Sequence, residues 1–305
     1  MSKKKKIKIK IKKKNFTIFI IIILLIIFSI TKTTSLIINL TKEKTKPQEE
    51  KKEKVLTPTE KKLLKLDNIN KEIDYFNNNY LDRYLKYKEN NPSIDTTQVI
   101  KNVNMNLDLS HYEDKIPASH LNETIILVNK YYYLDENYIP NDLEEISKQY
   151  ALSNMKMVKV AKEAFEEMAK AAKKENLNIV AMSTYRDYEY QTNLYNRYAK
   201  QDGIEAADTY SGRPGFSEHQ TGLAVDVYNN KETYTNFHLT NEFTWMQEHA
   251  KEYGFILRFP ENKEQETGYQ YESWHYRYVG KDIATYITDN NITLEEYHAT
   301  IIKEW

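Results

Sequence analysis

The sequence predicts an α+β fold for most of the chain, and three observations support that prediction. Helical apolar stripes alternate with short β-branched runs after about residue 150, as in domains that combine helices with a small sheet. The composition, with 40% hydrophobic and 29% charged residues, is typical of a globular domain. All 7 glycines lie between Gly203 and Gly280, so we expect the tight turns and close backbone approaches there.

Charge and cysteine content exclude several classes of function. Lysine and arginine number 44 and so do aspartate and glutamate, which gives a formal net charge of zero. A nucleic-acid binder normally carries a basic excess, so we expect no nucleic-acid partner. The absence of cysteine rules out disulfides, thiolate nucleophiles and Cys-ligated zinc. Any metal must therefore be held by His, Asp or Glu.

The N-terminal residues predict a membrane segment. A lysine-rich stretch at 1–14 precedes an apolar run at 16–30, which as a helix is ~22 Å long and is extended to a tilted span by residues 31–40. Because a lysine cluster in front of an apolar segment stays in the cytoplasm, we expect a single-pass signal anchor at 15–40 in the cell membrane, with the rest of the chain on the extracellular face. A cleaved signal peptide is the alternative, although only residues 33–35 offer a cleavage site.

Residues 41–58 and 59–92 predict a disordered linker followed by a helical stalk. The linker has hardly an apolar side chain, so it cannot bury enough surface to fold. The stalk has apolar residues spaced by three and four up to Pro92. These are Leu63, Leu66, Ile69, Ile73, Phe76, Tyr80, Tyr84 and Tyr87. An amphipathic stalk or a docked helix is favoured over a coiled coil with a partner, because asparagines at 77–79 interrupt the apolar seam.

The remaining residues, 93–305, predict one domain with a core at about 120–280. Ser153 and Asn154 are expected to cap a helix that carries an apolar stripe to Ala172. Residues 177–182 read as a buried strand. Asp187 is expected to cap the helix that follows.

The second half of the domain alternates in the same way. Strands are expected at 223–227, 255–259 and 269–279. Between the first two, Thr240 is expected to cap a helix that Gly254 closes. A capping box at residues 293–296 opens the last helix.

Two of the 7 histidines stand out as metal-ligand candidates, and the first is His219. If the segment from His219 to Asp226 were an extended strand, the two residues would be ~23 Å apart, and in a helix they would be ~10 Å apart. Neither regular geometry lets both bind one metal. Gly222 between them makes a fold-back plausible. In the strand, Asp226 shares a small-residue face with Ala224, and the neighbouring apolar residues point into the core. An alternative is that both side chains make ordinary hydrogen bonds.

The second candidate is His275, which follows Glu272 by three residues in an aromatic run. Three protein ligands with an open position for water form the usual catalytic zinc site, and a non-ligating carboxylate beside that water is the usual general base. His219, Asp226 and His275 would supply the ligands, and Glu272 the base. Arg186 would stabilise negative charge on an attacked carbonyl oxygen, or it would make only a surface salt bridge.

Three segments together closely resemble the VanY-type D-alanyl-D-alanine carboxypeptidases and their LD-carboxypeptidase relatives. The segments are SEHQTGLAVD at 217–226, ESWH at 272–275 and STYR at 183–186, and the resemblance runs from about 127 to 278. It implies an α+β domain of the Hedgehog/DD-peptidase type, with a small antiparallel sheet flanked by helices.

The same resemblance implies roles for individual residues. It implies Zn²⁺ held by His219, Asp226 and His275, Glu272 as the base, and Arg186 facing the tetrahedral intermediate or the substrate carboxylate. Two further residues, Gln191 and Ser217, fall where relatives contact the terminal D-alanine. Thr184 and Asp187 depart from the residues that relatives often have, which leaves fine substrate preference open.

The sequence therefore predicts a membrane-anchored extracellular zinc carboxypeptidase that removes the C-terminal D-alanine from peptidoglycan stem peptides. Alternatives are an endopeptidase or dipeptidase on the same scaffold, and a non-catalytic cell-wall-binding module. A pure binder has no chemical reason to keep both Glu272 and Arg186. A third alternative is a regulatory domain whose stalk recruits a partner. The preferred stem peptide and the oligomeric state do not follow from the sequence.

Overall fold

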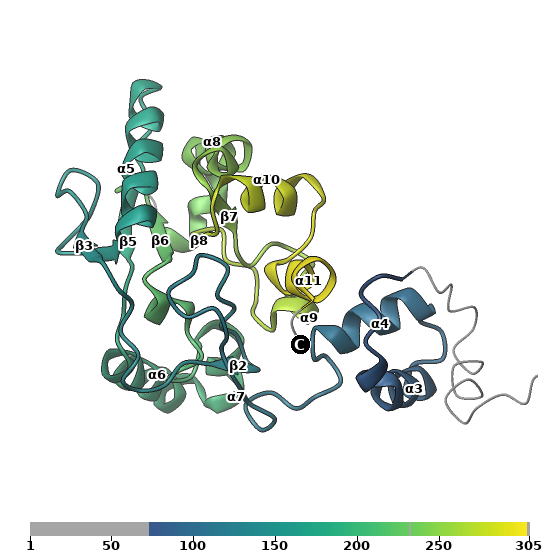
Figure 1. Cartoon of the computed structure of the whole chain (residues 1–305). Coiled ribbons are helices and arrows are strands. Elements are labelled where there is room, and N and C mark those ends of the chain that lie inside the picture. The colour runs from purple at the N-terminus through teal and green to yellow at the C-terminus, as the bar shows by residue number, and fades with distance from the viewer. Residues whose placement is uncertain (1–72, 232, 304–305) are drawn as a thin grey trace, which may run out of the picture. The chain divides into compact units, whose positions relative to one another are not determined.

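The computed structural model describes residues 73–231 and 233–303 (Figure 1). The basic segment, signal anchor and linker expected in residues 1–58 lie outside these ranges, and so does the first part of the stalk expected at 59–92. Within the two described ranges, no helix is both long enough and apolar enough to cross a bilayer.

A four-stranded antiparallel sheet forms the centre of the domain, as the sequence predicts. Its strand order is β5-β6-β8-β7. The strands span Val180–Ser183 (β5), Ala224–Tyr228 (β6), His275–Tyr278 (β8) and Phe255–Leu257 (β7). The strand expected at 269–279 is much shorter than predicted, because the chain turns before it, where His275 N donates to the Glu272 carbonyl at 3.2 Å.

Helix α5 (Lys159–Lys174) packs its apolar stripe into the main core beside the sheet (Figure 1). The stripe belongs to the same apolar cluster as Leu223, Val225 and Val227, the core-facing residues of the segment around β6. The predicted cap at Ser153 and Asn154 is wrong. Strand β4 (Lys156–Val158) pairs with β3 (Leu143–Glu145) up to the residue before α5, and no side chain caps that helix.

The other predicted caps in this half of the chain are confirmed. Asp187 accepts a hydrogen bond from Tyr190 N at 2.7 Å and opens α6. Thr240 accepts one from Phe243 N at 3.1 Å and opens α8, and Gly254 adopts the left-handed conformation after η4. These elements span Tyr188–Asp202 (α6), Asn241–His249 (α8) and Ala250–Tyr253 (η4), with Ile204–Tyr210 (α7) and Tyr234–Leu239 (η3) between them.

The C-terminal residues add short helices beyond the sheet. Thr293 accepts a hydrogen bond from Glu296 N at 3.1 Å, which confirms the predicted cap of the last helix. The helices span Glu264–Thr267 (α9), Lys281–Asp289 (α10), Leu294–Tyr297 (α11) and a π-helical turn, His298–Ile302 (η5).

The described part of the expected stalk, residues 73–92, contains one α-helix, which forms a helical hairpin with a second helix just after Pro92, in the segment expected to begin the domain. Asn77 accepts a hydrogen bond from Asn79 N, and among the residues from 73 onward the first helical turn follows it, at the asparagines that break the apolar seam. After η1 (Asn78–Tyr80), α3 (Leu81–Asn90) packs on α4 (Thr96–Asn104) through a small apolar core of its own. A two-residue pairing of β1 (Ile116–Pro117) with β2 (Tyr132–Tyr133) follows.

Candidate active site

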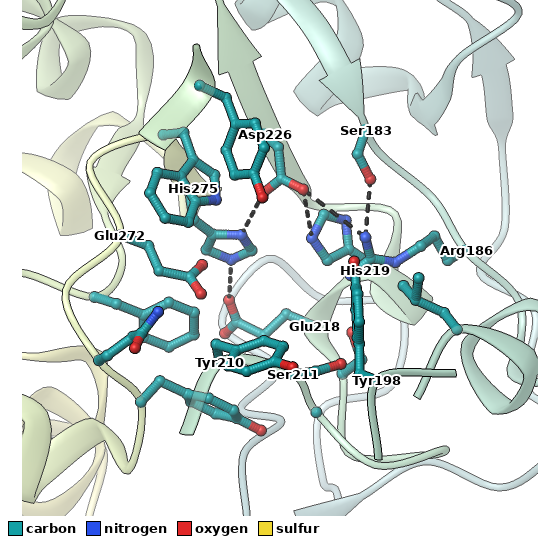
Figure 2. A pocket seen from close by; sticks show the side chains of 18 of the residues that line it. Ser183, Arg186, Tyr198, Tyr210, Ser211, Glu218, His219, Asp226, Glu272 and His275 are labelled. Carbon is teal, nitrogen blue, oxygen red and sulfur yellow. Dashed lines mark hydrogen bonds and ion pairs between the residues drawn. The ribbon is translucent and has the colours of Figure 1, made fainter. Parts of the chain in front are cut away.

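A cavity of about 580 Å³ contains most of the residues that the sequence singled out. Its walls come from the ends of β5, β6 and β8 and from the segment 210–219, with tyrosines of α6 and η3 at the rim. Figure 2 shows the two histidines, Asp226, Glu272 and Arg186 gathered around its floor.

Sheet register brings two of the candidate ligands together. In β6, Asp226 lies opposite His275 of β8 and opposite Ser183 of β5. His219 reaches the same place from η2 (Glu218–Thr221), because Gly222 ends that turn in the left-handed conformation, with φ of 69°, and folds the chain back. The ligand atoms of His219, Asp226 and His275 lie within 4.8 Å of one another, and all three residues are buried.

Hydrogen bonds fix how the two imidazoles face Asp226. His219 Nδ1 lies 2.6 Å from the Thr184 carbonyl and donates to it, so its Nε2 points at Asp226 Oδ2, 3.4 Å away. His275 Nδ1 lies 2.8 Å from Asp226 Oδ1, and its Nε2 lies 3.3 Å from Glu218 Oε2 (Figure 2). Two imidazole nitrogens and one carboxylate converge on one point, which is a donor set that zinc accepts in catalytic sites. These residues fit zinc.

Ionisation follows from the same contacts. Burial lowers the pKa of His219, and the neighbouring Arg186 lowers it further, which keeps the imidazole neutral as a ligand must be. For His275, burial also acts to lower the pKa, but hydrogen bonds with Asp226 and Glu218 raise it to about 9, so binding of a zinc ion would release a proton from this imidazole. Burial disfavours an ionised Asp226, yet the two histidines hold its pKa well below the usual value.

Glu272 lies beside the ligands without joining them. The turn that links its carbonyl to His275 N places its carboxylate next to the imidazole, pointing into the cavity (Figure 2). Burial, followed by the negative charges of Asp226 and Glu218, raises its pKa to about 8, although His275 and Arg186 oppose the shift. A carboxyl group whose pKa lies near neutrality can both take up and release a proton.

Arg186 is part of the cavity wall, so it is not a surface salt bridge. Its Nη1 donates to Ser183 Oγ at 3.0 Å and lies 3.8 Å from Asp226 Oδ2. Its backbone N donates to the His219 carbonyl at 3.2 Å, which ties the two motifs together. The Nε atom is buried and has no hydrogen-bond partner. The residue nevertheless lines the cavity, so its guanidinium group can face a ligand oxygen.

The two residues expected to contact D-alanine occupy different places. Ser217 lines the cavity next to His219. Gln191 is buried on α6 and does not line it; its side-chain amide donates to the Gly212 carbonyl at 2.7 Å, which fastens the loop that ends in Ser217.

Behind His275 lies a group of buried charges that the sequence motifs did not indicate. Glu218 Oε1 accepts hydrogen bonds from Arg258 Nε at 2.8 Å and Arg277 Nη1 at 2.9 Å. Burial opposes its ionisation, but both guanidinium groups lower the pKa of Glu218 below its usual range. One signal was available: Arg277 follows His275 by two residues in a buried strand, so both side chains lie on the same face and the arginine needs a buried acid.

Comparison with known proteins gives one family. A family model described as "VanY: D-alanyl-D-alanine carboxypeptidase" matches residues 154–281. The chain is 42% identical over 186 residues to YodJ of Bacillus subtilis (strain 168), a match that covers 59% of this chain and 68% of YodJ.

Two solved structures resemble the described fold. The LdcB LD-carboxypeptidase has a TM-score of 0.58 and 37% sequence identity, over 64% of this chain and 94% of that one. A variant of the D,D-pentapeptidase VanY from a VanB-type resistance cassette, solved in complex with Zn(II), has a TM-score of 0.50 and 30% identity, over 57% of this chain and 98% of that one. The mixed fold of helices around a small sheet is shared with both.

Proposed function

Because this chain belongs to the VanY family of D-alanyl-D-alanine carboxypeptidases, we propose that it removes the C-terminal D-alanine from peptidoglycan stem peptides. Membership makes it a zinc metallo-carboxypeptidase. The observation that carries the proposal is the convergence of His219, Asp226 and His275 in one cavity with Glu272, a carboxyl group outside the ligand set.

His219, Asp226 and His275 would hold the zinc ion through the atoms that face one another. When bound, zinc supplies a Lewis acid that lowers the pKa of a water molecule toward neutrality and polarises the scissile carbonyl. Both imidazoles are already oriented for binding, because the Thr184 carbonyl fixes the His219 tautomer and the Glu218 carboxylate faces Nε2 of His275.

Glu272 transfers a proton from the attacking water to the leaving group. It accepts the proton that the attacking water loses and donates it to the amine of the departing D-alanine. Without a bound cation, burial raises the pKa of the Glu272 carboxyl group to about 8, and a zinc ion beside it would lower that pKa and favour the ionised form that accepts the proton.

Arg186 binds the oxygen on which negative charge develops, or the terminal carboxylate of the substrate. Arg186 lines the cavity with its Nη1 3.8 Å from Asp226 Oδ2, which places a fixed positive charge at the edge of the ligand group. Ser217 also lines the cavity, where it would contact the terminal D-alanine.

The cavity accepts more than one amino acid. Its volume of about 580 Å³ falls within the roughly 300–1,000 Å³ of pockets that bind drug-sized ligands. A peptide end therefore fits better than a free alanine. Similarity to both an LD-carboxypeptidase and a D,D-pentapeptidase leaves the tetrapeptide and the pentapeptide as candidate substrates.

Mass spectrometry of stem peptides tests the proposed reaction. We expect the zinc-loaded protein to release one alanine from the pentapeptide (D,D activity) or from the tetrapeptide (L,D activity), and Glu272→Ala to lower kcat by about 10²- to 10⁴-fold with zinc still bound. Free D-Ala-D-Ala and a cross-linked dimer serve as controls. If only free D-Ala-D-Ala were cleaved, the protein would be a dipeptidase, and if only the cross-linked dimer were cleaved, it would be an endopeptidase. No cleavage of any substrate by a folded, zinc-loaded sample would favour a wall-binding module.

We also propose that the enzyme is anchored in the cell membrane and works on its extracellular face. The apolar run at 16–30 behind a lysine-rich stretch supports the anchor, and the polar residues 41–58 supply a linker of the kind that lets a tethered domain reach its substrate. Fractionation tests this, because a chain that starts at residue 41 should no longer sediment with membranes.

A further inference from the structure

Behind His275 lies a group of four charged residues that is almost sealed from solvent. Glu218, Arg258, Arg277 and Glu295 are each no more than 4% exposed. Glu218 divides its two oxygens: Oε2 faces His275 Nε2 at 3.3 Å (Figure 2), and Oε1 accepts from both arginines. The orientation of the Glu218 carboxylate, and with it that of the imidazole, therefore depends on where the two guanidinium groups lie.

The two arginines are fixed in different ways. Arg277 Nη2 donates to the backbone carbonyls of Thr124 at 3.0 Å and Ile126 at 2.6 Å. Arg258 has a side-chain partner instead: its Nη1 and Nη2 donate to the two oxygens of Glu295 at 2.9 and 2.5 Å. Glu295 also accepts from Asn129 Nδ2 at 3.1 Å. Arg258 thus bridges two carboxylates, one facing the metal ligand and one on α11.

This bridge is sensitive to the loss of either acid. Two guanidinium groups and two carboxylates balance in charge, and a buried ion pair that loses one partner leaves an uncompensated charge. Without a charged Glu295, two of the donors of Arg258 lose their bidentate partner. We expect Arg258 to shift toward the remaining acid, Glu218, and to pull its carboxylate out of line with His275.

We propose that Glu218 is the positioning residue of His275 and that Glu295, from the C-terminal helix α11, is required to hold it in place. A carboxylate on the outer nitrogen of a metal-bound imidazole fixes its tautomer and orientation and raises its basicity. Residue 295 lies outside the region 154–281 that the family model matches, so the C-terminal segment completes the zinc site of this chain. The inference rests on the proposed zinc site.

The neighbouring acid on α11 supplies a matched control. Glu296 is also largely buried, but its carboxylate pairs with Lys101 Nζ at 2.5 Å and makes no contact with Arg258. Glu295→Gln and Glu296→Gln each remove one negative charge from the same turn with almost no change in shape. A general loss of helix docking should affect both variants, whereas a role in orienting His275 should affect only the first.

The experiment measures zinc affinity by competition with a chromophoric chelator, in the full chain, beside the melting temperature of each zinc-free variant. We expect Glu295→Gln to weaken zinc binding by about 10- to 100-fold and Glu296→Gln to leave it unchanged. Glu218→Gln should weaken zinc binding by a similar factor, and it keeps the test decisive if Glu295→Gln does not fold.

Equal zinc affinity in folded Glu295→Gln, Glu296→Gln and unmodified protein would overturn the role of Glu295, and equal affinity in Glu218→Gln would overturn that of Glu218. Neither result would contradict the proposed function, which is tested by hydrolysis of stem peptides by the unmodified protein. Conversely, tight zinc binding without hydrolysis in the unmodified protein would overturn the proposed function while the affinity comparison still decides the role of the buried charges.

Discussion

Arg186 offers the sharpest test of the chemistry at the scale of one residue. Its guanidinium group lines the cavity, donates to Ser183 and faces Asp226. Arg186→Lys keeps the charge but loses the planar fork of donors. We expect kcat/KM for the preferred stem peptide to fall by about 10²- to 10³-fold, as for other lost oxyanion donors, with zinc affinity unchanged.

Ser183→Ala is the control for that substitution. It removes one hydrogen-bond partner of Arg186 and leaves the guanidinium in place, so we expect a much smaller decrease in kcat/KM. If Arg186→Lys turned over stem peptides as fast as the unmodified enzyme, Arg186 would have only a structural role.

Residue types and local spacing reveal the ligand candidates but not what supports them. His219, Gly222 and Asp226 occur within one short segment, so a fold-back between them can be anticipated from the sequence. The partners of Glu218 are 40 and 59 positions away in the chain, at Arg258 and Arg277. No periodicity encodes such a pairing, because it exists only once the sheet has brought distant strands together.

At the scale of single elements, Gly222 controls how η2 joins β6. Its φ of 69° lies in the left-handed region, and a Cβ there would meet Leu143 Cδ2 at 2.9 Å and Val158 Cγ2 at 3.1 Å. We expect Gly222→Ala to lower the free energy of unfolding by about 2 kcal/mol, from backbone strain plus this contact. Because the turn also carries His219, zinc affinity should fall in the same variant. Urea denaturation and chelator competition measure the two effects.

Gly268→Ala isolates the backbone contribution. Gly268 has φ of 77°, and a Cβ there would meet only the flexible stem of Lys130, at 3.0 Å. We expect a loss of about 1 kcal/mol and no change in zinc affinity. Identical results for the two alanine variants would mean that the packing of Gly222 against β3 and β4 does not matter.

Which elements could be predicted depends on the range of the interactions that define them. The caps at Asp187, Thr240 and Thr293 are local hydrogen bonds over three residues, and all three are correct. The start of α5 depends instead on pairing between β3 and β4, so the polar residues at 153–154 misled the prediction. Likewise the aromatic run at 269–279 has strand propensity throughout, but the turn at Glu272 takes its first half out of the sheet.

At the scale of the whole described chain, segments on both sides of the family region meet at α11. Glu295 of that helix bonds to Arg258, and the next residue, Glu296, pairs with Lys101 of α4. Asn104 at the end of α4 donates to the Ala299 carbonyl at 3.3 Å. The hairpin α3–α4 is thus docked on α11 and the η5 turn after it, yet its apolar core is its own. Polar docking of this kind holds a position without contributing much stability.

A deletion series tests whether the hairpin contributes little to the stability of the zinc site, and it also tests the proposed anchor. We compare the full chain with chains that start at residues 41 and 105, the latter without the hairpin. Only the full chain should sediment with membranes. Because the hairpin contacts α11 and η5 through a part-buried ion pair and a buried hydrogen bond, each worth about 1 kcal/mol, both shorter chains should bind zinc and keep kcat/KM within about threefold of the full chain. Membrane sedimentation of the 41-start chain would contradict the anchor. Loss of zinc binding only in the 105-start chain would mean that the hairpin, through Lys101 and Glu296, is needed to hold α11 and Glu295 against Arg258.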